Sequence, residues 1–129
     1  VASFVGEINR IPVTVVGSDA SGLDLKGPGG LKLIFPRGVE NVGVGSSAEL
    51  YVRPEDIQVV VRPAAGVNAL QANVLACSYQ GSFTHVVLSA EGLDNLLVAA
   101  PASPATDTLA PGQPINLSFD LERASLLPA

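Results

Sequence analysis

Apolar and polar residues alternate with a period of two along much of this chain, and this pattern limits the fold more than any other feature. In INLSFDL, the apolar residues at 115, 117, 119 and 121 alternate with polar ones, and the same spacing recurs elsewhere. Because successive side chains of a strand point to opposite faces, each such segment predicts a half-buried strand. Strands are expected at 11–15, 23–26, 31–35, 48–52, 57–62, 72–79, 83–89, 96–100 and 115–121.

Glycine and proline divide the chain into short pieces and leave little room for helices. The sequence contains 13 Gly and 10 Pro. The segment GPGG at 27–30 is typical of a hairpin break. The segment PASPATDTLAPGQP at 101–114 is expected to be a loop, because its prolines lack the N–H that a central strand needs. Many short strands with turns between them predict an all-β barrel or sandwich with very little helix.

A weak internal repeat divides the chain into two halves. GEINRIPVTV at 6–15 aligns with AGVNALQANV at 65–74, and GSSAELYV at 45–52 aligns with GQPINLSF at 112–119. The shifts are 59 and 67 residues, so the second copy carries about eight more residues, which we expect in the proline-rich loop. The repeat favours two related half-barrel lobes, roughly 1–62 and 63–129, that interleave. Chance similarity between two strands is the alternative.

The charge balance and composition disfavour several classes of function. Seven basic residues face twelve acidic ones, for a net charge of −5. Nucleic-acid binding is therefore not expected, since it requires clustered Lys and Arg and stacking aromatics, and the chain has only four Phe and two Tyr. No apolar run reaches the roughly 18 residues that a membrane span needs, so direct membrane insertion is not expected. The chain contains no Met, even at position 1, so we expect a piece of a longer protein, with a processed or tag-trimmed whole protein as the alternative.

The densest charge lies in Arg-Pro-Glu-Asp, residues 53–56, between two expected strands. Pro54 presets the backbone angle of a turn, so this segment is expected to form a corner. Arg53 is expected to be partly buried and to pair with Glu55, Asp56 or backbone carbonyls. In the alternative interpretation the two carboxylates bind a metal or act as acid and base. Adjacent turn residues seldom converge on one atom and no His lies nearby, so the structural interpretation is favoured.

Other reactive residues predict no catalytic, cofactor or metal site in this chain. His85 is the only histidine, so a metal site built from several histidines is excluded, and no GxSxG motif accompanies a serine. Cys77 is expected to be a core residue. KGPGG lacks the GK[ST] of a phosphate-binding loop. No enzymatic activity is therefore expected of the chain by itself.

Three motifs in order, FVGEIN at 4–9, VRPEDI at 52–57 and YQG at 79–81, resemble the C-terminal region of ATP-binding subunits of ABC importers. The segment GEIN at 6–9 is similar to the corresponding segment in the polyamine (spermidine/putrescine) branch of these importers. The resemblance implies an OB-like barrel, called a TOBE domain, over residues 1–129, with a regulatory and dimer-stabilising role. The implied structural signature comprises Gly6, Asn9, Arg53, Pro54, Glu55, Asp56, Asn68 and Gly81.

The resemblance also implies partners and a location. ATP and Mg²⁺ would bind in a nucleotide-binding domain outside these residues, since no Walker A loop and no LSGGQ occur among them. The implied partners are a second copy of the subunit and the membrane permease subunits, at the cytoplasmic face of the membrane. The apolar segments VASFV at 1–5 and ASLLPA at 124–129, the latter with leucines expected to be exposed, are the material for self-association.

The repeat also resembles the molybdate-binding relatives of this fold, and a small-oxyanion sensor is the alternative function. Asn68, Leu70 and Val74 match the second half of the motif SARNxLxGxV, and Asn9 matches it more loosely. Asn9 and Asn68 are therefore candidate oxyanion contacts. The Ser-Ala-Arg part is replaced in both copies, and Glu7 would repel an anion.

Overall fold

The computed structural model describes residues 8–20, 22–39, 42–60, 68–90, 92–101 and 109–129. This part of the chain contains strands, two short 3₁₀ turns and no α-helix, which confirms the all-β prediction. None of its helical turns is long and apolar enough to cross a membrane. The elements are β1 (Asn9–Asp19), β2 (Gly22–Lys26), η1 (Pro28–Gly30), β3 (Lys32–Phe35), β4 (Ser47–Val52), η2 (Pro54–Asp56), β5 (Ile57–Val60), β6 (Ala69–Gln80), β7 (Phe83–Ala90), β8 (Leu93–Pro101), β9 (Pro114–Phe119) and β10 (Ser125–Pro128).

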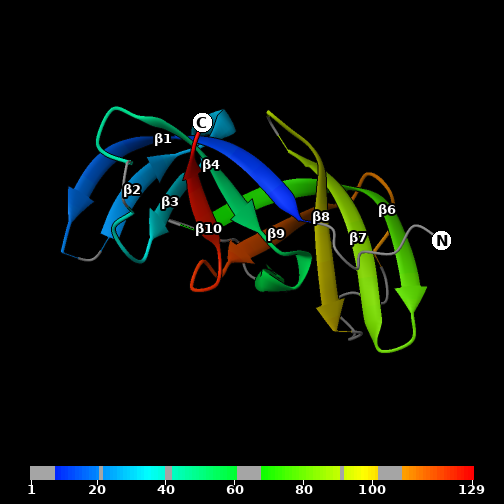
Figure 1. The fold of residues 1–129 in the computed structure, drawn as a ribbon. Coiled ribbons are helices and arrows are strands. Elements are labelled where there is room, and N and C mark those ends of the chain that lie inside the picture. Colours follow the sequence, from blue (N-terminus) through cyan, green and yellow to red (C-terminus); the bar gives the residue numbers. More distant parts are fainter. Residues whose placement is uncertain (1–7, 21, 40–41, 61–67, 91, 102–108) are drawn as a thin grey trace.

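The strands form two antiparallel sheets of five strands each, in the orders β10-β4-β1-β2-β3 and β5-β9-β6-β7-β8. Figure 1 shows β2 and β3 at one end of the molecule and β6, β7 and β8 at the other. We call these sheets the first and second lobes. Each lobe takes four strands from one half of the chain and one from the other, because β10 completes the first lobe and β5 the second. The two halves of the chain therefore interleave because each half contributes one strand to the lobe formed mainly by the other half.

The strand register shows that the two halves are structural copies. In β1 the register shifts between Val15 and Gly17, and in β6 it shifts between Val74 and Ala76, the positions that the sequence repeat aligns with them. β10 pairs with β4 through Leu126 and Leu50, and β5 pairs with β9 through Val59 and Leu117. The larger shift of the repeat takes Leu50 to Leu117 and Val59 to Leu126, so these two pairings are equivalent as well. A chance likeness between strands does not account for such agreement, so the repeat is real.

The eight additional residues of the second half lie in two places. Leu25 pairs with Val15 and Leu88 pairs with Val74, so β2 and β7 differ by 63 positions. Four of the residues therefore lengthen the β6–β7 hairpin, and only the other four follow β8. The expectation that the proline-rich loop holds all eight is wrong, because a hairpin can grow by two residues on each strand without changing its register.

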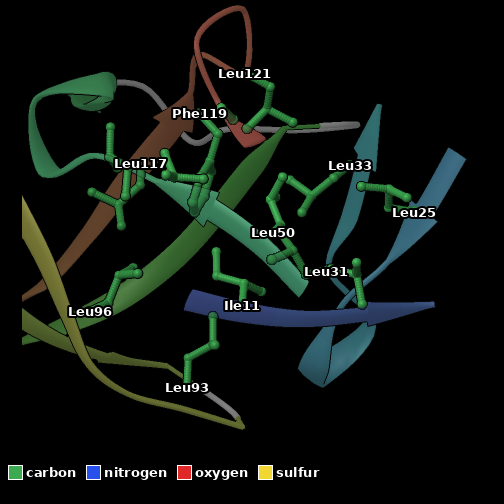
Figure 2. Close-up of a cluster of buried hydrophobic side chains, with 14 of the residues drawn as sticks. Ile11, Leu25, Leu31, Leu33, Leu50, Leu93, Leu96, Leu117, Phe119 and Leu121 are labelled. Carbon is green, nitrogen blue, oxygen red and sulfur yellow. The ribbon is translucent and has the colours of Figure 1, made fainter. Parts of the chain in front are cut away.

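The inward-facing residues form one apolar cluster that extends through both lobes. Ile11, Leu50 and Leu117 are completely buried, as the alternating pattern predicts. Figure 2 shows these side chains, together with Phe119 and Leu33, converging from strands of both halves. Each fully buried side chain of this size contributes about 1.5–3 kcal/mol to stability through removal from water. Since the lobes share the cluster, neither has a separate core.

The strand β10 was not among the predicted strands. Its residue Leu126 is buried at 3% exposure, whereas Leu127 is 51% exposed, so the expectation of exposed leucines at 124–129 is correct for only one of them. Four residues ending in a proline give little local strand signal. They form a strand here because β4 offers an edge with which they pair.

Candidate functional site

The Arg-Pro-Glu-Asp segment forms a tight corner between β4 and β5. Pro54–Asp56 is a 3₁₀ turn, closed by a hydrogen bond of 3.0 Å from the Asp56 N–H to the Arg53 carbonyl. Pro54 and Asp56 are buried, whereas Arg53 and Glu55 are exposed. We call residues 53–57 the first corner. The corner therefore lies at the residues that the sequence predicts. Of its two acidic residues, only Asp56 is buried.

The partner of Asp56 is Arg123, not Arg53. The Arg123 Nη2 donates to the Asp56 Oδ1 at 2.6 Å, and the Asp56 side chain is 2% exposed while that of Arg123 is 72% exposed. Arg53 follows the inward-facing Val52 in extended backbone, so its side chain points outward. The expected pairing of a partly buried Arg53 within its own corner is therefore wrong.

The ion pair joins two equivalent corners of the repeat. Arg123 follows Asp56 by 67 residues, the same shift that relates β4 to β9 and β5 to β10. We call residues 120–124 the second corner. The Asp120 N–H also donates to the Asp56 carbonyl at 2.9 Å, so backbone and side-chain bonds connect the corners. Asp56 and Arg123 therefore occupy equivalent positions of the repeat, carry opposite charges and form an ion pair with each other.

Two asparagines connect each lobe to the outer strand of the other. The Asn9 amide donates from Nδ2 to the Leu97 carbonyl and accepts at Oδ1 from the Leu97 N–H, both at 2.7 Å. The Asn68 Oδ1 accepts from the Ile34 N–H at 2.8 Å. The repeat aligns Asn9 with Asn68, and the strand register aligns Ile34 with Leu97, so the two contacts are equivalent. The sequence repeat pairs these asparagines, but their role depends on strands distant in the chain.

This geometry bears on the candidate oxyanion contacts. Both polar atoms of the Asn9 side chain bond to Leu97, and the residue is 5% exposed. Asn68 has a φ of 56°, a left-handed conformation that asparagine tolerates better than most residues. Its backbone N–H donates to the Lys32 carbonyl at 2.8 Å. The observed contacts hold the lobes together, and an anion-binding role for either residue stays a prediction.

The remaining sequence candidates lie apart from the corners. Gly6 is outside the described residues. Gly81 lies in the β6–β7 turn with a φ of 66°, a conformation that favours glycine. His85 lies in β7, opposite Ser78 and Ala99. Cys77 is half-buried against the core, and this burial raises the pKa of its thiol. Within the described ranges, no three His, Cys, Asp or Glu side chains gather as a metal site would require.

Tyr51, beside the first corner, gives a testable pH dependence. Its hydroxyl donates to the Glu49 Oε2 at 2.7 Å, and this hydrogen bond is the main cause that raises the pKa of Tyr51 above 10.0. A raised pKa means that the contact stabilises the fold below pH 10 and that this contribution is lost as pH rises through the folded-state value. In a Tyr79→Phe variant, which keeps Tyr51 as its one tyrosine, absorbance at alkaline pH should show this delayed ionisation. Adding Glu49→Gln should lower the midpoint, and an unchanged midpoint would contradict the assignment.

A family comparison covers the corners and the exchanged strands. The family model for the TOBE domain matches residues 50–127, more than half of the chain. The chain belongs to the TOBE domain family. The matched residues include both corners, so Asp56 and Arg123 both lie within the segment that the family model covers.

Two curated relatives align with nearly the whole TOBE chain. It is 30% identical over 129 residues to the spermidine/putrescine import ATP-binding protein PotA of Rubrobacter xylanophilus, covering 98% of this chain and 33% of that protein. It is 31% identical over 122 residues to the sulfate/thiosulfate import ATP-binding protein CysA 2 of Chromobacterium violaceum, covering 91% and 31%. The chain therefore spans about a third of the length of these relatives.

A solved structure shares the fold of this TOBE chain. The crystal structure of the cytoplasmic molybdate-binding protein ModG, with molybdate bound, superposes with a TM-score of 0.74 at 15% identity, covering 94% of this chain and 96% of that one. At this identity the likeness shows the fold alone. An OB-like architecture of two related lobes is therefore shared with ModG.

Proposed function

We propose that this TOBE chain is the regulatory and dimer-stabilising C-terminal domain of the ATP-binding subunit of an ABC importer. The observation that carries this proposal is the alignment of almost the whole chain with a third of two import ATP-binding proteins. ATP and Mg²⁺ would bind in the other part of the subunit, and hydrolysis would occur there. The domain would act through protein contacts, in the cytoplasm at the membrane, beside the permease subunits.

The transported substrate that we propose is a polyamine. The segment GEIN at 6–9 and the spermidine/putrescine relative favour it. The sulfate/thiosulfate relative is equally similar, so the domain itself does not discriminate between the substrates. Transport assays with radiolabelled spermidine and sulfate in cells that express the complete importer would separate them. Uptake of spermidine is the expected result, and uptake of sulfate alone would overturn this assignment.

The parent-subunit proposal has a direct genetic test. The coding sequence upstream of Val1 should encode a Walker A loop and an LSGGQ motif in the same reading frame. Removing residues 1–129 from that subunit should leave ATP binding in place and weaken the regulation of ATP hydrolysis. A gene that lacks both upstream motifs would overturn the proposal.

Self-association is expected of this chain if the domain stabilises a subunit pair. Leu127 offers exposed apolar surface beside the outward-facing Glu49 of β4. A two-fold interface is self-complementary, so one such patch is sufficient. Sedimentation equilibrium from micromolar to near-millimolar protein should show a rise from the monomer mass of 13.1 kDa toward twice that value. Leu127→Ser should reduce the association, and a constant monomer mass would place the pairing energy elsewhere in the subunit.

An oxyanion sensor is the second candidate, favoured by the shared fold with a molybdate-bound protein. The commitment of the Asn9 side chain to Leu97 weighs against a site at that position. Calorimetric titration with molybdate, tungstate, sulfate and phosphate tests this candidate. Heat of binding that disappears in Asn68→Asp would support it, and the absence of heat with all four anions would remove it.

A further inference from the structure

The first lobe contains an arginine that closes the gap between its two outer segments. The Arg37 guanidinium donates from Nη1 to the Glu122 carbonyl at 3.1 Å and from Nη2 to the Ala124 carbonyl at 2.6 Å. Its Cζ also lies 4.5 Å from the centre of the Phe35 ring. Arg37 lies just after β3, and its acceptors belong to the second corner. A guanidinium therefore links the end of β3 to the segment that leads into β10.

The second lobe has the same geometry without the arginine. The shift that relates β3 to β8, and so Ile34 to Leu97, takes Arg37 to Ala100. The shift that relates Asp56 to Arg123 takes the acceptor residues Glu122 and Ala124 back to Glu55 and Ile57. Alanine has no group that could reach those carbonyls. Among the described residues, no guanidinium makes the equivalent link between the end of β8 and the first corner.

A pocket of about 380 Å³ lies at this place. On one side it is lined by residues of the first corner and β5, namely Glu55, Ile57, Gln58 and Val59. On the other side it is lined by small residues of β8, namely Ala99, Ala100 and Pro101. The lining includes Ala100, which the repeat relates to Arg37. It also includes Glu55 and Ile57, the equivalents of the two residues whose carbonyls accept from Arg37. Among the described residues of this lining, Glu55 is the one with an ionisable side chain, and its carboxylate brings negative charge to the pocket.

We propose that this pocket, which we call the β5–β8 slot, binds an alkyl guanidinium group that takes the place held by Arg37 in the first lobe. A guanidinium has five donors in a fixed plane and matches carbonyl and carboxylate acceptors well. Here the acceptors would be the Glu55 and Ile57 carbonyls and the Glu55 carboxylate. Val98 stands where the first lobe has Phe35, so the ring contact of Arg37 has no counterpart. Binding of an isolated group is expected on the order of millimolar.

The guanidinium could belong to a free metabolite or to an arginine side chain of a partner protein. The recognised group is the same in both cases, and the probes distinguish them. Butylguanidine represents the free group, and an acetyl-Gly-Arg-Gly-amide peptide represents a side chain on a backbone. Butylurea and the citrulline peptide, which are neutral and of nearly the same shape, are the matched controls.

The test is a two-dimensional ¹⁵N NMR titration of the whole chain with these four probes. Saturating shifts of the Ile57, Ala99 and Ala100 amides by the guanidinium probes, and not by the urea probes, are the expected result. Butylguanidine alone would indicate a metabolite, and the peptide binding more tightly would indicate a partner side chain. Equal shifts with the neutral probes, or no saturable shift with any probe, would overturn the proposal.

Reciprocal variants exploit the repeat. Ala100→Arg should fill the slot and abolish the shifts, whereas Arg37→Ala should open the equivalent place in the first lobe and raise the number of sites from one to two. Glu55→Gln, at an exposed position, should weaken binding about three-fold, and serves where either other variant fails to fold. Asp24→Asn, in β2 of the first lobe and outside the slot lining, removes a negative charge elsewhere and is the control for Glu55→Gln. Unchanged binding in both Ala100→Arg and Glu55→Gln would refute the assignment.

Discussion

Replacing Arg123 with alanine is expected to lower the free energy of unfolding by about 3 kcal/mol. The Asp56 side chain is 2% exposed and its Oδ1 accepts from Arg123 at 2.6 Å. Its Oδ2 is buried and has no hydrogen-bond partner among the described residues. Arg123→Ala would therefore leave a buried carboxylate without its cation, which costs more than the loss of an exposed ion pair.

Urea denaturation monitored by circular dichroism measures this effect. Arg53→Ala is the matched control from the same corner, and because Arg53 is exposed we expect a change below about 0.5 kcal/mol. Asp56→Asn should reduce the cost of Arg123→Ala, since a neutral amide needs no countercharge. The double-mutant cycle should give a coupling of about 1–3 kcal/mol. Equal stabilities for Arg53→Ala and Arg123→Ala would show that the corner acid does not depend on Arg123.

Asn9→Ala is expected to cost about 3 kcal/mol, because it removes two hydrogen bonds and leaves the Leu97 N–H and carbonyl without their partner. Asn9 is 5% exposed, so water does not readily replace the lost amide. Since Leu97 belongs to the outer strand of the second lobe, the loss should loosen the contact between the lobes.

Hydrogen exchange of the Leu97 amide, together with thermal unfolding, measures this second effect. The exchange rate of Leu97 should rise in Asn9→Ala more than the rates of amides in β4. Asn73→Ala replaces an exposed asparagine of β6 and is the control. Unchanged protection of Leu97 would mean that its hydrogen bond to Asn9 does not limit exchange of this amide.

The local part of the fold could be predicted from the sequence, and the exchanged strands could not. Alternation identified Ile115 and Leu117 as inward-facing because strand periodicity is a property of neighbouring residues. The pairing of β10 with β4 joins segments from opposite ends of the chain, and SLLP carries no pattern that specifies β4 as its partner. Which half supplies the fifth strand of each lobe is likewise a property of the packed molecule.

The position of the first corner is encoded locally in the sequence, but the partner of its buried acid is not. Pro54 placed the turn correctly, since its backbone angle is fixed by its ring. Proximity in sequence favours pairing of Arg53 with Glu55, Asp56 or nearby carbonyls, whereas in the structure Asp56 pairs with Arg123. The repeat contained the better signal, because its larger shift takes Asp56 to Arg123. Opposite charges at equivalent positions predict a contact where the two copies of a corner meet.

The exchange of β5 and β10 has a consequence for synthesis on the ribosome. The second sheet needs β9, which ends at Phe119, and the first sheet needs β10, which begins at Ser125. A chain that emerges in order therefore holds β1 to β4 with an open β4 edge until Ser125–Pro128 has left the exit tunnel. Open edges recruit other strands, so nascent chains carry this risk longest at β4. Each lobe thus closes only after its last strand, β9 or β10, has been synthesised. A ribosome that stalls before residue 123 releases a product with neither a complete first sheet nor the cation for Asp56.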